Sequence, residues 1–138
     1  MSAQTDLSTG AEFVAKPYLL DDAAAAAYAQ GIKEASRRKG KNIHSDRDAA
    51  AKAGFRAPIA AGEQTIAVAM QLIVDRFGER FLRGGAFDVA LIKPVLFGDT
   101  ITAHARIAGS ENGNLKLDIW VDNQQGERVL SGNVGVRR

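Results

Sequence analysis

The spacing of hydrophobic residues changes along this chain. Before residue 78 they recur with the period of a helix, and after residue 85 they alternate with polar residues as in a strand. Segment 23–38 is rich in alanine, begins after Asp21 and Asp22 and ends in basic residues, which is the polarity expected of a helix. Segment 63–77 is apolar on most sides, a pattern typical of a buried helix. We therefore expect two main helices in the first half.

Shorter signals lie around these helices. Asp46 is positioned to cap a short helix that Gly54 would end. Residues 12–20 carry β-branched and aromatic side chains, and Pro17 among them suits the end or edge of a strand.

The second half of the chain predicts an antiparallel sheet. Turn-like sequences separate four segments, 86–97, 99–109, 114–123 and 126–138. Two of them alternate clearly, because one face of each carries the apolar residues Ile101, Ala103, Ala105 and Ile107, and Leu115, Leu117, Ile119 and Val121. We read the four as a meander. One strand, then helices, then a run of strands predicts an α+β domain with a sheet around the central helix.

Size and composition favour one globular domain. The chain has 138 residues, of which 46% are hydrophobic and 25% charged, and a formal net charge of +2. We expect residues 1–11 to be a flexible N-terminal segment and residues 12–138 to form the domain. The small net charge gives no indication of nucleic-acid binding. The absence of cysteine and of an apolar run long enough for a membrane span predicts a cytoplasmic protein that does not bind membranes.

Candidate chemistry is concentrated in KGKNIHSD, residues 39–46. His44 could act as a base, because an imidazole titrates close to neutral pH. Arg37, Arg38, Lys39 and Lys41 precede it. These cations either form a solvated helix end or make a subsite for an anion.

Several sequence elements, in order, resemble the MaoC-like hotdog-fold hydratases and dehydratases. They are NIHSDRDAAAKAGFRAPIAAG, the apolar helix that ends in RFG, KPVLFGDTIT, and VDNQQGERVLSGNVGV. The similarity spans about residues 12 to 136. It implies a hotdog fold, in which an antiparallel sheet wraps a long central helix, and a homodimer of single hotdogs joined edge to edge, or a higher assembly of dimers.

The resemblance also implies a lyase that acts on acyl thioesters. The substrate would be a 2-enoyl or 3-hydroxyacyl chain on coenzyme A or acyl carrier protein, and no metal or redox cofactor would take part. His44 would be the base, with Asn42 and Glu63 as assisting residues. The backbone N–H of Gly62 would bind the thioester oxygen at a helix N-terminus. Arg37, Arg38 and Lys41 would bind an anionic group, such as a coenzyme phosphate.

One part of the family pattern is missing. The motif places an aspartate five residues before the histidine, but here that position falls at Lys39, or at Gly40 if one residue is deleted. Glu63 is one possible replacement, whereas Asp46 suits a helix cap.

Other interpretations therefore remain open. The chain could catalyse a different step on a related substrate, or bind an acyl thioester or small acid without hydrating it. It could also be the inactive partner of an active subunit. Thioester hydrolysis is a third activity of this fold class, and the motif favours it less.

Overall fold

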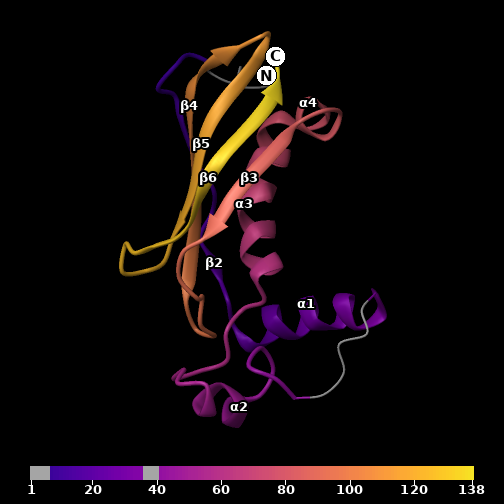
Figure 1. Ribbon diagram of the computed structural model, residues 1–138, viewed down its shortest axis with the longest axis vertical. Helices are drawn as coiled ribbons and strands as arrows, with labels where there is room; N and C mark the ends of the chain where they lie inside the picture. Colours follow the sequence, from indigo (N-terminus) through magenta and orange to yellow (C-terminus); the bar gives the residue numbers. More distant parts are fainter. Residues whose placement is uncertain (1–6, 36–40) are drawn as a thin grey trace.

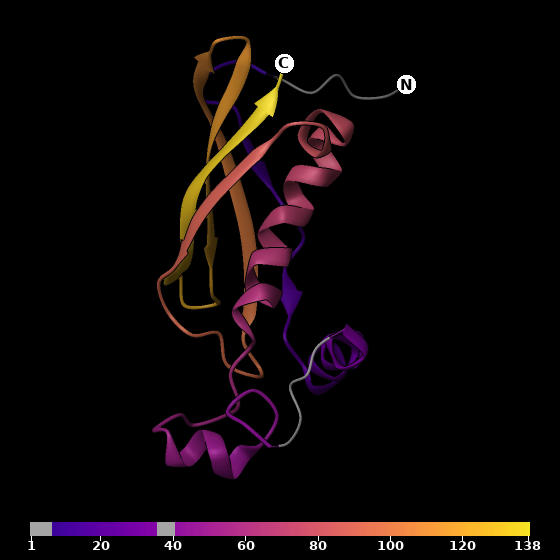
Figure 2. The same ribbon diagram turned by 45° about the vertical axis from the view of Figure 1, so that its right-hand side comes forward.

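The structure is a computed structural model that describes residues 7–35 and 41–138. It has the α+β hotdog fold, in which an antiparallel sheet packs against one long helix (Figures 1 and 2). The helices and strands are, in chain order, β1 (Glu12–Val14), β2 (Tyr18–Leu19), α1 (Asp22–Ala35), α2 (Arg47–Lys52), α3 (Gly62–Phe77), α4 (Glu79–Leu82), β3 (Ala86–Leu91), β4 (Thr100–Glu111), β5 (Asn114–Asp122) and β6 (Arg128–Arg137).

The strand order is β1-β4-β5-β6-β3, and β2 also pairs with β4. The meander is therefore confirmed for β4, β5 and β6. It is wrong for the segment that begins at residue 86, because β3 pairs with β6 at the far edge of the sheet. This segment is also a strand only as far as Leu91. Beyond it, the chain with Pro94 leaves the sheet and hydrogen-bonds to the loop before α3.

The N-terminal strand is divided in two by the segment that contains Pro17. Val14 pairs with His104 and Tyr18 pairs with Ile101, so both halves follow β4. The prediction that residues 12–20 form a strand is thus correct, but the prediction that this strand is continuous is wrong. Pro17 has no N–H to donate to the neighbouring strand, so the hydrogen bonding is interrupted there.

The expected helix caps are present. The Ala24 N–H donates to Asp21 Oδ1 at 2.7 Å, and the Ala49 N–H donates to Asp46 Oδ1 at 2.8 Å. Gly54 follows α2 with a φ of +91°, a conformation that suits glycine at the end of a helix. Asp46 therefore has the capping role expected of it.

Helix α3 packs on the sheet through one side only. Ala69, Leu72 and Ile73 are buried against the apolar face of the sheet, and the rings of Phe13 and Phe77 meet edge to face at 5.9 Å between centroids. The buried face of β4 and β5 is the one predicted from the alternation. The opposite side of α3 is exposed, so the expectation of a helix buried on most sides is wrong for a single chain.

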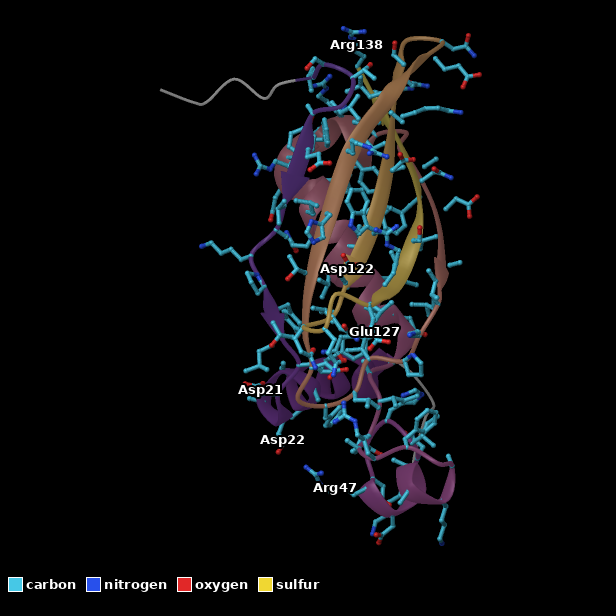
Figure 3. All side chains as sticks on the ribbon, turned by 90° about the vertical axis from the view of Figure 1, so that its left-hand side faces the viewer. Asp21, Asp22, Arg47, Asp122, Glu127 and Arg138 are labelled. Atoms are coloured by element: carbon cyan, nitrogen blue, oxygen red, sulfur yellow. The ribbon has the colours of Figure 1, made fainter. Side chains whose placement is uncertain are left out.

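The outer face of the sheet, which is turned toward the viewer in Figure 3, carries the polar side chains of the alternating pattern. His104 stacks on Trp120 there, with 5.4 Å between ring centroids, and the Arg128 guanidinium lies 5.1 Å from the Trp120 ring. Trp120 is thus half-buried on this face and not in the core. Among the described residues, no helix is long and apolar enough to cross a membrane.

Candidate active site

His44 lies in a tight turn that is fixed by its neighbours. The His44 N–H donates to Asn42 Oδ1 at 2.8 Å, and the Asn42 N–H donates to Ser45 Oγ at 3.2 Å. The Asp46 N–H donates to the Asn42 carbonyl at 2.9 Å, where α2 is about to begin. Asn42 therefore shapes the backbone on both sides of His44.

The half-buried His44 ring has a backbone partner. Its Nδ1 lies 3.0 Å from the carbonyl oxygen of Ile59. Because a carbonyl oxygen only accepts, Nδ1 must carry the proton in this contact, and the lone pair of a neutral ring is then on Nε2. Within residues 7–35 and 41–138, the ring is thus oriented by a carbonyl and not by a carboxylate.

The loop that contains Ile59 is held from two sides. The Ile59 N–H donates to the carbonyl of Ile43 at 3.0 Å, and Ile59 pairs with Leu96 in an isolated bridge. The Ala60 N–H donates to the Val95 carbonyl at 2.7 Å. The loop therefore connects the histidine turn to the segment between β3 and β4.

A buried carboxylate anchors that segment. Asp99, which is only 5% exposed, accepts hydrogen bonds from the Leu96 N–H at 2.8 Å and from Gln124 Nε2 at 2.9 Å. Arg56 Nη2 lies 3.5 Å from Asp99 Oδ1. Since Leu96 pairs with Ile59, Asp99 stabilises the backbone that carries the carbonyl partner of His44.

The N-terminus of α3 follows this loop directly. Ala61 is the N-cap residue and supplies no side-chain hydrogen bond, so the first amides of the helix have no cap of that kind. A Cβ added to Gly62 would lie 2.6 Å from Leu91 Cδ1. Gly62 has no positive φ, so the close approach of Leu91, and not the backbone conformation, is what favours glycine here.

The remaining candidates lie around these two features. Glu63 is exposed in the first turn of α3. Lys41 Nζ is exposed and lies 4.0 Å from Asp46 Oδ2, the carboxylate that caps α2. Arg37 and Arg38 lie outside the described residues. The structure thus brings Asn42 and His44 into one turn and places Gly62 and Glu63 just after the loop that binds the His44 ring.

Three residues near the site were not singled out as site residues from the sequence. Ile59 contributes only a backbone carbonyl, which no side-chain pattern reveals. Leu91 is apolar in an alternating strand and resembles any strand residue. Asp99 is the first residue of a predicted strand segment, and its sequence neighbourhood gives no indication of the contacts with Arg56 and Gln124.

Comparisons with known proteins extend this description. A family profile described as "MaoC like domain" matches residues 41–127, which is more than half of the 138 residues. A search of curated proteins gives no match. The matched region contains the histidine turn, α3 and the Asp99 segment.

Three similar solved structures have the same fold. The (R)-hydratase from A. caviae involved in PHA biosynthesis has a TM-score of 0.76 and 20% identity, covering 97% of this chain and 98% of the other. The HadBC complex (3R-hydroxyacyl-ACP dehydratase) from Mycobacterium tuberculosis gives 0.70 and 18%, with coverage of 97% and 98%. A monoamine oxidase regulatory protein from Archaeoglobus gives 0.72 and 24%, with coverage of 94% and 88%.

Proposed function

The chain belongs to the MaoC-like domain family, and on that premise we propose that it adds water to 2-enoyl thioesters or removes it from 3-hydroxyacyl thioesters. The proposal is supported by two structural neighbours, one described as an (R)-hydratase and one as a 3R-hydroxyacyl-ACP dehydratase. The observation that carries it in this chain is the contact between His44 Nδ1 and the Ile59 carbonyl.

That contact prepares His44 for proton transfer. With the proton held on Nδ1, Nε2 accepts a proton from water while the water oxygen forms a bond to C3 of the enoyl chain. The electron pair of the double bond moves toward the thioester carbonyl, whose oxygen becomes negative. A proton delivered to C2 then restores the thioester, and dehydration is the reverse sequence.

The developing oxyanion requires donors that are already in place. We assign this role to the Gly62 N–H, because amides at the N-terminus of a long helix favour negative charge. The Leu91 side chain beside Gly62 would exclude water from this position, which strengthens such a hydrogen bond.

The second proton transfer has two possible carriers. The imidazolium formed at His44 can itself protonate C2, or Glu63 in the first turn of α3 can take this proton from His44 and pass it to C2. Asn42 assists in either case by fixing the turn around His44. A Glu63→Gln variant separates the two, since it stays active only if His44 transfers both protons.

Charge near the site suggests how the carrier is recognised. Lys41 is exposed beside the histidine turn, and we propose that with Arg37 and Arg38 it binds a phosphate of coenzyme A or of the acyl carrier protein. Reversal of the charge by Lys41→Glu should raise the KM for a coenzyme A thioester and leave kcat nearly unchanged. An unchanged KM would exclude Lys41 from carrier binding.

We further propose a homodimer that pairs through β3. This strand lies at the edge of the sheet, and Leu91 and Ile92 at its end are 49% and 53% exposed. Unpaired edge strands with exposed apolar residues favour association with another chain. Light scattering of the wild type and of Ile92→Lys tests this, because the substitution should shift a dimer toward monomer.

A second candidate function is that of a binding or partner subunit. It is favoured by the missing aspartate of the family motif, where this sequence has Lys39 and Gly40, and by the neighbour that is described as a complex, HadBC. Thioester binding without turnover, or turnover that appears only when a related subunit is added, would support this candidate.

A further inference from the structure

A cavity of about 790 Å³ runs along α3. It is bounded by α3, by Tyr28 of α1 and by the segment that joins β1 to β2, at the opposite edge of the sheet from β3. Its volume is within the range of small-molecule sites, roughly 300–1,000 Å³. Among the described residues, His44, Asn42, Gly62 and Glu63 are not part of its lining.

The cavity runs along α3, and its wall combines apolar residues with polar ones such as Gln64 and Gln71. The segment Val14–Tyr18 lies against α3, with Val14 near the end of the helix that carries Arg76 and Tyr18 near the end that carries Gln64, as the contacts of Phe13 with Phe77 and of Gln64 with Tyr18 show. From Gln64 to Arg76 the helix axis measures roughly 18 Å. The apolar lining residues are Val14, Ala15, Ala67, Val68 and Leu72.

One end of the cavity is polar. Gln64 is only 5% exposed, and its Nε2 donates to the Tyr18 hydroxyl at 3.2 Å. A glutamine side chain at such a position costs free energy unless its polar atoms are satisfied. The Tyr18 hydroxyl oxygen accepts this bond, so the two side chains satisfy part of each other's hydrogen-bonding capacity.

The lining of the cavity also carries more positive than negative charge. Its charged lining residues are Lys16, Asp75 and Arg76. Asp75 already accepts a hydrogen bond from Gln71 Nε2 at 2.7 Å. The Arg76 guanidinium lies 5.3 Å from the centroid of the Phe13 ring, a contact that holds it at one end of the cavity.

We infer that this cavity binds a linear carboxylate with an apolar chain. The carboxylate would lie at Lys16 and Arg76, and the chain would extend along the wall toward Tyr18 and Gln64. The apolar lining residues would hold the chain, and the excess of positive charge from Lys16 and Arg76 over Asp75 favours a carboxylate head group. A neutral chain would lack this charge interaction, and a cationic chain would be repelled.

Calorimetric titration of the full chain with decanoate tests the inference. The controls 1-decanol and decyltrimethylammonium have the same chain and differ in the charge of the head group. Decanoate should bind most tightly and decyltrimethylammonium most weakly. Equal binding of all three, or no binding of decanoate, would overturn the inference.

Substitutions locate the binding within the cavity. Ala67 is exposed on α3, so Ala67→Phe should fill the cavity without disturbing the core and weaken decanoate binding about tenfold or more. The matched control is Ala51→Phe, at an exposed alanine of α2 outside the lining, and it should bind like the wild type. Unchanged binding by Ala67→Phe would place the ligand elsewhere and contradict the inference.

A second pair of variants tests whether Lys16 and Arg76 bind the carboxylate. Lys16→Gln combined with Arg76→Gln should weaken decanoate binding about fivefold or more and leave decanol binding unchanged. Arg83→Gln, at an exposed cation outside the lining, should have no effect. His44→Ala should also bind decanoate normally, so this result does not depend on whether the protein hydrates thioesters.

Discussion

Leu91 Cδ1 lies 2.6 Å from the position that a Cβ on Gly62 would occupy. An edge strand thereby covers the first residue of the central helix, where the proposed oxyanion donor lies. The contact favours a residue without a side chain at position 62, and it provides a direct test of the role of that position.

Gly62→Ala should lower kcat about tenfold by crowding the N–H, which is less than the loss that follows complete removal of an oxyanion donor. The free energy of unfolding should change by less than about 1 kcal/mol, because Leu91 is half-exposed and can move. Adding Leu91→Ala should restore much of the activity, and Leu91→Ala alone is the control. Full activity in Gly62→Ala would exclude Gly62 from the oxyanion site.

Asn42 is expected to act through the backbone and not on the substrate. Its Oδ1 accepts from the His44 N–H, and aspartate preserves this acceptor. Asn42→Asp should therefore keep most of the activity, whereas Asn42→Ala should lose about 1 kcal/mol of stability with a drop in kcat. If Asn42→Asp is as inactive as Asn42→Ala, the amide N–H₂ group is needed and this assignment is wrong.

Asp99 is expected to stabilise both the fold and the histidine turn. Asp99→Ala leaves the Leu96 N–H and the Gln124 amide without their acceptor and should lower the free energy of unfolding by about 1–3 kcal/mol in chemical denaturation. The control is Asp118→Asn, in the partly exposed pair with Arg106, where at most about 1 kcal/mol should be lost. Similar losses in the two variants would contradict the anchoring role of Asp99.

Glu127 should contribute a small, pH-dependent part of the stability. Hydrogen bonds from Lys93 and then Asn123 hold the pKa of its carboxyl below the ordinary value of 4.5. A lowered folded-state pKa stabilises the protein above the ordinary pKa, and this stabilisation is lost as the pH falls through the lowered value. The Tm difference between the wild type and Glu127→Gln should thus be present at neutral pH and shrink on acidification below about pH 4.5. A difference that grows in acid would contradict the assignment.

Local patterns were sufficient to predict much of this fold. The alternation of apolar and polar residues correctly identified the buried faces of β4 and β5. Asp21, Asp46 and Gly54 correctly indicated where helices begin or end. The position of β3 beside β6 could not be predicted in this way. Alternation shows which face of a strand is buried but not which strand lies next to it, and that choice depends on how the whole sheet packs on α3.

Only those parts of the candidate site that consist of side chains could be predicted from the sequence. The motif identified Asn42 and His44, which the structure places in hydrogen-bonding contact along one turn. The Ile59 carbonyl is 15 residues from His44 in sequence and belongs to an apolar residue. Its contact with the ring depends on the pairing of Ile59 with Leu96, a long-range interaction that residue types do not indicate.

The central claim is that His44 acts as a base on an enoyl thioester. The most direct measurement follows the loss of enoyl absorbance with a panel of short, medium, branched and carboxylated enoyl-CoA substrates, for the wild type and for His44→Ala. The account predicts turnover by the wild type on at least one substrate and a loss of at least about 100-fold in His44→Ala, with the fold intact. Turnover that His44→Ala retains, or thioester binding with no turnover by the wild type, would contradict it.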